Sequence, residues 1–338
     1  MNVLVTGASG FIGGALVKRL RARGDAVRVL VRRTSQRAHL EALGAEVAFG
    51  DLLTGEGLES AVHGAHGVVH LAGLTRARDE AAFHRGNAGG TRLLAAAISR
   101  MDSPARLVHC SSLAAAGPSP AHRPRTELDE PAPVSWYGRS KLAAEAAVRE
   151  FAARLPAVII RPPIVYGPGD RVNLPPLLAM ARLGVFVKPG LRRRPFSFIH
   201  VEDLCQGLEQ ALQRGETVTP EDLSRGVYFV ADPDVHTWDG FCAALSHALG
   251  RKRPVRMLPV PEALAPAVGR LSEWLGHWTG EQPILNRDKA REMVAEAWTC
   301  APDRAMRELG FHARWAPIQA GLEDAVGWYR AEGLLPSA

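Results

Sequence analysis

The chain is poor in the features that mark several protein classes. It has four cysteines among 338 residues, and none forms a CxxC pair or stands near histidines at a zinc-binding spacing. We therefore expect no disulfide framework and no metal site, and we interpret Cys110, Cys205, Cys242 and Cys300 as small buried hydrophobic residues. No apolar run reaches the ~18 residues of a membrane-spanning helix. Because a strand pattern begins at residue 2, we expect no signal or transit peptide, a cytoplasmic protein and no membrane partner.

The chain also has no long run of charges of one sign, since the positive residues behind its net charge of +6 are spread along the sequence. This spread does not indicate a nucleic-acid partner. Two tight basic clusters interrupt it, Arg192 to Arg194 and Arg251 to Arg253. Most clusters of this length are solvated surface, and contact with an anionic ligand is the alternative interpretation.

What the chain does have is a regular alternation of short apolar runs and longer helical patterns. The predicted strands are Asn2–Thr6, Ala26–Val31, Glu46–Phe49, Gly67–His70, Arg106–Cys110 and Ala157–Arg161. Two of the predicted helices cover about residues 79–99 and 137–154. Because the strands are apolar nearly throughout and are separated by helices, the pattern predicts an α/β protein with a doubly wound parallel (Rossmann) sheet. In such sheets, ligands bind beyond the carboxyl ends of the strands.

The alternation breaks near residue 168. We expect residues 1–167 to form the Rossmann domain, with strands at about 196–201 and 227–230 added late to its sheet, so that about 196–232 returns to it. A smaller, mostly helical substrate-binding lobe is expected from 168–195 and 233–338. Six of the seven tryptophans lie at or beyond Trp238, either as core of this lobe or as walls of a pocket. The spacing over 263–278 predicts a lid or packing helix rather than a membrane anchor.

Three glycines, Gly7, Gly10 and Gly13, lie between the first predicted strand and the first predicted helix. Gly7 permits a tight turn, Gly10 lets a diphosphate approach the backbone, and Gly13 lets the helix pack closely on the sheet. The unpaired N–H groups and the helix dipole at this point favour an anion. We therefore predict a dinucleotide site, to which this loop also contributes Ser9, Phe11 and Ile12.

The second predicted strand ends in "VRVLVRR", where a carboxylate would accept a hydrogen bond from the ribose of NAD. Arg32 and Arg33 stand there instead, and a guanidinium pairs with phosphate. We expect NADP(H), contacted chiefly by Arg32, with NAD(H) possible; an ordinary exposed arginine pair is the alternative. Further cofactor contacts are expected at the ends of the third and fourth strands, at Asp51, Leu52, Leu71, Ala72 and Gly73.

The segment "YGRSK" places Tyr137 and Lys141 on one face of a helix. A nearby ammonium stabilises tyrosinate and is expected to lower the pKa of the tyrosine, which suits proton transfer. The same lysine can bond the ribose hydroxyls of a nicotinamide nucleotide, so both residues also count as cofactor contacts. Ser111 and Ser112 follow the fifth strand, where a hydroxyl can hold a substrate oxygen.

Taken in order, these segments resemble the extended short-chain dehydrogenase/reductases of the NAD-dependent epimerase/dehydratase superfamily. The matching segments span about residues 1–210 and read TGASGFIG, GDL, HLAG, NAGGT, SSLAAAG, YGRSK, RPPIVYGPGD and FIHVEDL. The resemblance implies a catalytic Ser112, Tyr137 and Lys141, with Ser112 preferred to Ser111 because the family's hydroxyl lies five residues before the glycine, here Gly117.

The resemblance also implies a mechanism. Ser112 holds the substrate oxygen, Tyr137 gives or takes its proton, and the nicotinamide exchanges hydride with the substrate carbon. Pro162 and Ile164 are implied beside the nicotinamide ring. Asn87 either orders the wall of the active site or caps a helix.

Few residues distinguish between the branches of the family. Dehydratases carry an Asp-Glu pair after the catalytic hydroxyl, where this chain has Leu113 and Ala114. Many sugar-nucleotide epimerases carry an arginine at the place of Phe196. The arginines at 32 and 33 resemble those of dihydroflavonol reductases, and the chain is nearest to these and to 3β-hydroxysteroid dehydrogenases.

We therefore expect an NAD(P)-dependent oxidoreductase that interconverts a ketone and a secondary alcohol of a small-molecule substrate. An epimerase acting on a sugar or nucleotide sugar is the alternative, and a non-catalytic dinucleotide-sensing module is the interpretation outside enzymology. Ala-rich faces at 91–98 and 142–151 would allow a homodimer, and ordinary packing explains them equally well.

Overall fold

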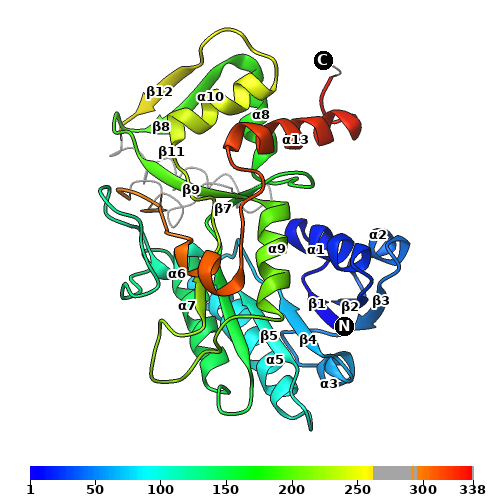
Figure 1. Cartoon of the computed structure of the whole chain (residues 1–338). Coiled ribbons are helices and arrows are strands. Elements are labelled where there is room, and N and C mark those ends of the chain that lie inside the picture. The colour runs from blue at the N-terminus through cyan, green and yellow to red at the C-terminus, as the bar shows by residue number, and fades with distance from the viewer. Residues whose placement is uncertain (262–290, 293–294, 337–338) are drawn as a thin grey trace.

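The computed structural model describes residues 1–261, 291–292 and 295–336 (Figure 1). The helix expected at 263–278 lies outside these residues. Within them, no helix has both the length and the apolar character needed to cross a membrane. All four cysteines are free and buried, as predicted.

A seven-stranded parallel sheet forms the larger part of the molecule, which confirms the predicted architecture. Its strand order is β10-β6-β5-β4-β1-β2-β3. The strands are β1 (Asn2–Thr6), β2 (Ala26–Val31), β3 (Glu46–Phe49), β4 (Gly67–His70), β5 (Arg106–Cys110), β6 (Ala157–Arg161) and β10 (Val227–Phe229). The order reverses between β1 and β4, so the carboxyl ends of these two strands open the crevice in which such sheets bind ligands.

Helices cover both faces of this sheet, because its strands are apolar on both sides. On one face α1 (Phe11–Ala22), α2 (Ala38–Ala42) and α9 (Val201–Ala211) bury residues such as Leu16 and Leu204. The other face is covered by α3 (Leu58–Val62), α5 (Gly90–Ser99) and α7 (Trp136–Arg149).

The helix predicted over 79–99 is divided into three parts. Asp79 caps α4 (Glu80–His84) by accepting a hydrogen bond from the Ala82 amide at 2.7 Å. A π-helical turn (Arg85–Gly89) then precedes α5. Such a turn adds a residue to the helix and changes which side chains face inward. Here it buries Asn87, which is 2% exposed.

The smaller part of the molecule contains two small sheets. Strands β7 (Ile164–Tyr166), β9 (Pro195–His200) and β11 (Val235–Thr237) form one, in the order β11-β9-β7, while β8 (Val185–Pro189) pairs with β12 (Arg256–Val260) in the other. The helices α8 (Leu174–Leu183), α10 (Trp238–Ala248) and α13 (Ile318–Ala331) pack on them. The short α6 (Leu113–Ala116) and a π-helical turn (Ala305–Leu309) complete the described elements.

One predicted strand is therefore misplaced. The segment at 227–230 does join the main sheet as β10, but the segment at 196–201 forms β9 in the three-stranded sheet. The aromatic side chains of β9 explain this. Phe198 stacks on Phe241 of α10, with ring centroids 4.5 Å apart, so β9 buries its aromatic face in the smaller lobe. Ile199, on its other face, packs in the core of the main sheet.

Candidate active site

The glycine loop has the close backbone packing that a phosphate cradle requires. Gly7 has a φ of +71°, and a Cβ there would lie 2.6 Å from the Ala72 amide nitrogen. A Cβ at Gly13 would overlap the Gly7 carbonyl oxygen and lie 2.6 Å from Ala8 Cα. No side chain caps α1 at Gly10, so its first amides can bond a ligand. The loop fits a nucleotide diphosphate.

The structure places the cofactor contacts that were predicted after β4 next to this loop. Leu71, Ala72 and Gly73 follow β4, and the Ala72 amide donates to Thr6 Oγ1 at 3.3 Å. Ser9 is exposed at the turn, while Phe11 and Ile12 are half-buried at the start of α1.

Asn87 orders the loop after β4. Its Oδ1 accepts from the Leu74 amide at 2.6 Å, and its Nδ2 donates to the Leu74 carbonyl and to Ser140 Oγ at 2.8 Å. Ser140 lies in α7, next to Lys141. Asn87 thus ties the end of β4 to the helix that carries Tyr137, and it does not cap a helix.

Beyond β2 the two arginines differ in their surroundings. The Arg33 guanidinium lies 5.1 Å from the ring centroid of Phe49, at the end of β3. Arg32 is exposed, and in the described part of the chain no hydrogen bond or ion pair engages its guanidinium. Asp51 Oδ1 accepts from the Leu53 amide at 2.7 Å, and Leu52 packs beside Gly90.

The three predicted catalytic residues meet where β5 ends and α7 begins. Ser112 Oγ accepts a hydrogen bond from the Ala114 amide at 3.1 Å, and Ser112 is close enough to the Tyr137 hydroxyl to stabilise its ionised form. Lys141, one turn further along α7, is buried and donates from Nζ to the Cys110 carbonyl at 2.6 Å.

The electrostatics of the tyrosine differ from the expectation. Burial raises the pKa of Tyr137, and the Ser112 hydrogen bond opposes this effect only in part. Burial also lowers the pKa of Lys141. The predicted lowering of the tyrosine pKa was therefore wrong for this structure, because desolvation dominates and the lysine bonds to the Cys110 carbonyl. Beside Lys141, burial followed by the lysine charge lowers the pKa of His70 to about 3.

Sequence reasoning missed a buried ion pair under this site. Glu145 and Arg161 are 0% and 1% exposed, and their two hydrogen bonds measure 2.8 and 2.6 Å. Glu145 also accepts from Ser111 Oγ at 2.5 Å. Burial is the largest single effect and opposes ionisation, but the charge and hydrogen bonds of Arg161, together with Arg149 and Ser111, outweigh it and lower the pKa of Glu145. The signal in the sequence was an acidic residue four positions after Lys141, on the same face of an Ala-rich helix.

This pair joins the ends of β5, β6 and α7. Arg161 is the last residue of β6 and precedes Pro162, whose carbonyl accepts from the Leu113 amide at 2.8 Å. Pro162 is buried and Ile164 is 38% exposed. The Ser111 hydroxyl is occupied by Glu145, whereas Ser112 faces Tyr137.

An apolar wall stands next to Tyr137. Trp298 and Phe229 belong to a buried cluster against which Tyr137 and Phe196 pack. Trp298 therefore lies near the candidate catalytic tyrosine, while Trp238 stacks on Phe241 in the core of the smaller lobe. Trp274 and Trp278 lie outside the described residues.

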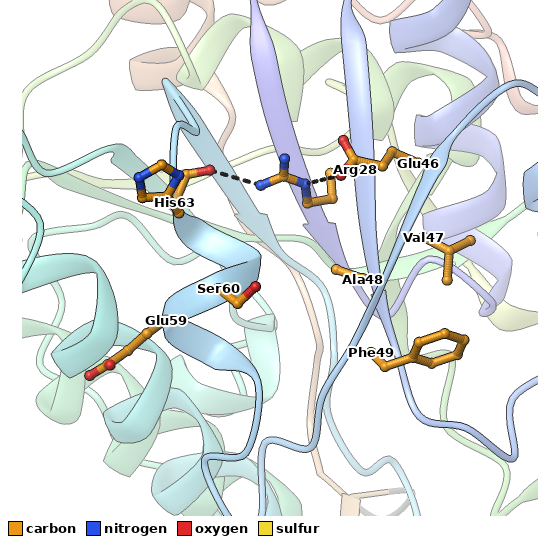
Figure 2. Close-up of a pocket in the computed structure, with 8 residues that line it drawn as sticks. All are labelled: Arg28, Glu46, Val47, Ala48, Phe49, Glu59, Ser60 and His63. Atoms are coloured by element: carbon orange, nitrogen blue, oxygen red, sulfur yellow. Dashed lines mark hydrogen bonds and ion pairs between the residues drawn. The ribbon is translucent and has the colours of Figure 1, made fainter.

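A separate hollow, drawn in Figure 2, lies along the edge strand β3 and against α3. Its Arg28 guanidinium is already engaged, at 3.0 Å from Glu46 and 2.8 Å from the His63 carbonyl. Neither the glycine loop nor any of the three predicted catalytic residues lines this hollow, so we do not count it as part of the candidate site.

Comparisons with known proteins agree with this geometry. The family model described as "NAD dependent epimerase/dehydratase family" matches residues 3–226. The chain belongs to this family. Its members that resemble the chain are extended short-chain dehydrogenase/reductases, and the protein is an NAD(P)-dependent oxidoreductase or epimerase of that type.

Two relatives of this family cover most of the chain. Ceramide reductase of Caulobacter vibrioides is 35% identical over 334 residues, which are 99% of this chain and 96% of that protein. The 4-hydroxy-2-methyl-3-oxo-4-farnesyl-3,4-dihydroquinoline-1-oxide ketoreductase of Stigmatella aurantiaca is 32% identical, over 88% of this chain and 92% of that protein.

Among solved structures, the UDP-glucose 4-epimerase of Thermus thermophilus in complex with NAD aligns with a TM-score of 0.75 over 98% of this chain and 99% of its own. At 24% identity this likeness shows the fold alone.

Proposed function

We propose that this protein is a reductase that uses NADP(H) to interconvert a ketone and a secondary alcohol, with Ser112, Tyr137 and Lys141 as catalytic residues. The observation that carries the proposal is the meeting of Ser112, at the end of β5, with the Tyr137 hydroxyl, whose pKa burial raises and Ser112 lowers in part, and with Lys141 buried one turn along the same helix as Tyr137. In this family, a bound nicotinamide supplies or accepts the hydride.

The chain's own residues then handle the oxygen and its proton. Ser112 Oγ donates a hydrogen bond to the substrate carbonyl, and the Tyr137 hydroxyl gives the proton that turns the oxygen into an alcohol. A tyrosine with a raised pKa holds its proton firmly at neutral pH, so it starts the reductive direction in the protonated form. The buried Lys141 ammonium stabilises the tyrosinate left behind.

The proposed substrate is a ketone that bears a long apolar group. One support is the apolar wall of Phe196, Phe229 and Trp298 beside Tyr137. Another is that the two relatives above are named for ceramide and for a farnesyl-bearing compound. We propose that residues 168–200, which include β9, and 233–338 form the lobe that selects this substrate, and that 1–167 with about 201–232 hold the cofactor. The homodimer remains a prediction.

The cofactor preference rests on Arg32. Its guanidinium is exposed just past the end of β2 and is not engaged by the described residues, so it is available for a 2′-phosphate. The glycine loop, the residues after β4 and Lys141 would hold the remainder of the nucleotide.

The test is the reduction of methyl ketones of increasing chain length, with the rate measured as the oxidation of NADPH. We expect kcat/KM to rise with chain length, and Tyr137→Phe to lower kcat about 10³-fold while NADPH affinity is retained. Tyr228→Phe is the control, because that hydroxyl bonds Glu308 at 2.7 Å, away from the site. A Tyr137→Phe variant with full activity would reject the catalytic proposal.

An epimerase predicts a different result in a simpler experiment. Epimerases of this family regenerate the cofactor within each turnover and keep NAD bound. If the protein is such an epimerase, denaturing the purified protein would release NAD(H), which would be detected in the supernatant. We expect instead a protein that is purified largely without nucleotide and that binds added NADPH.

A further inference from the structure

The two-stranded sheet of β8 and β12 has one face without cover. The strands run parallel, with Phe186 in register with Met257 and Val187 in register with Leu258. Phe186 and Met257 pack into the core with α8 and α10. Because side chains alternate along a strand, Val187 and Leu258 point to the opposite face, where they are 49% and 50% exposed.

This exposure is unusual for parallel strands, which normally have both faces covered. Figure 1 shows β8 and β12 at the outer edge of the smaller lobe, with α8 and α10 on their inner side. Leu191, two residues after β8, is 80% exposed. Val187 and Leu258 are thus neighbouring exposed aliphatic side chains, and Leu191 adds a third just beyond the end of β8.

Cations lie at both ends of these two strands. The fold brings the two basic clusters of the sequence to the same small sheet, since Arg192 and Arg193 follow the end of β8 and Arg253 precedes β12. Segments 171–193 and 249–261 contain nine of the 41 Lys and Arg of the chain and none of its 35 Asp and Glu. The rest of the chain therefore has more acidic than basic residues.

We propose that this β8–β12 surface, formed by Val187, Leu191, Leu258, Arg192, Arg193 and Arg253, docks on an anionic phospholipid bilayer. Exposed aliphatic side chains flanked by arginines match the two layers of such a membrane, since the cations meet the headgroup phosphates and the aliphatic groups enter the acyl boundary. A nucleic acid would use the cations but would leave the leucines in water.

The proposal revises the expectation of no membrane partner, because a surface that folding assembles from two distant segments has no signal in any one of them. It does not depend on the catalytic proposal, because none of its residues belongs to the candidate active site. It concerns a reversible surface contact and adds no membrane-spanning element.

The test is co-sedimentation of the full chain with sucrose-loaded vesicles of phosphatidylcholine alone or mixed with phosphatidylglycerol. We expect binding to the mixed vesicles, little binding to phosphatidylcholine alone, and release at about 1 M NaCl, where charges are screened beyond ~3 Å. The double variant Arg192→Gln/Arg193→Gln should bind about 25-fold more weakly, at roughly fivefold for each cation removed. Leu191→Ser/Leu258→Ser should also weaken binding.

The matched control is Lys18→Gln/Arg307→Gln, which removes the same charge from exposed positions elsewhere. Equal binding by this control and by the Arg192/Arg193 variant would overturn the proposal, as would no binding to anionic vesicles at low salt. Tight binding to transfer RNA that is unaffected by Leu191→Ser/Leu258→Ser would assign the surface to nucleic acid instead. Circular dichroism and NADPH binding show whether each variant is folded.

Discussion

The two parts of the molecule hold their polar groups in different ways. In the parallel-sheet part, buried polar side chains at the strand ends have fixed partners, such as Glu145 with Arg161 and His70 with Thr6 and Thr91. In the smaller lobe, the core is largely apolar and aromatic, and most cations lie on the surface. This contrast indicates that the cofactor half is specified by backbone and buried polar geometry, whereas the lobe that we expect to select the substrate is specified by side-chain packing.

The largest effect is expected from breaking the buried pair of the sheet half. Glu145→Ala leaves the Arg161 charge unpaired in the core and should lower the free energy of unfolding by about 3–5 kcal/mol. Urea unfolding measures it. Glu150→Ala is the control near the end of the same helix, because Glu150 and its partner Arg92 are 47% and 51% exposed, and its loss should cost at most ~1 kcal/mol. Equal losses in both variants would contradict the comparison.

A backbone-level constraint should be nearly as severe. Gly13→Ala drives a Cβ into the Gly7 carbonyl, so the loop must shift, and we expect NADPH affinity to fall by about 100-fold. Gly14→Ala is the matched control, since its Cβ would meet only Ala8 O at 3.9 Å. Isothermal titration with NADPH compares them. Similar affinities for both variants would show that the loop tolerates the shift.

At the boundary of the two parts, Asp232 should make stability depend on pH. It follows β10, its amide donates to Phe198 O at 2.9 Å, and its carboxylate oxygens have no hydrogen-bond partner among the described residues. Burial, with the charges of Asp203 and Asp234, raises its pKa from 3.8 to about 7.

Because the folded chain binds this proton more tightly than the unfolded chain, stability should fall as pH rises from about 4 to about 7. Asp232→Asn removes the ionisation and should therefore stabilise the protein by on the order of 2 kcal/mol at high pH, and by much less at low pH. Thermal melts at several pH values check this. A gain in stability that does not vary with pH would show that the ionisation of Asp232 is not its cause.

The smallest effect concerns the choice of cofactor. Arg32→Gln should weaken NADPH binding about tenfold and leave NADH binding unchanged, because one charge-assisted phosphate contact is lost. Arg33→Gln should have less effect on this ratio, since Arg33 packs on Phe49. Dissociation constants of each variant for NADPH and NADH show which of the two arginines contacts the 2′-phosphate. A larger effect at Arg33 would exchange the two roles.

Much of the sheet half was predictable because its signals are local. Each strand of the Rossmann sheet is a short apolar run, and the glycine loop lies directly between a strand and a helix. The buried partner of Glu145 was not predictable, since Arg161 is sixteen positions away and only the pairing of β5 with β6 beside α7 brings the two together. The predicted lowering of the Tyr137 pKa was wrong for a similar reason, because the burial that raises this pKa depends on the packed structure.

Local sequence patterns were sufficient for the parallel architecture, the phosphate-binding loop and the segments that carry Ser112, Tyr137 and Lys141, since hydrophobic period and glycine placement act over a few residues. The packing of the folded chain was needed to establish that β9 leaves the main sheet and that two distant basic clusters flank the two ends of one small sheet with an exposed aliphatic face. Both depend on the pairing of segments far apart in the chain, whose energies no local pattern contains.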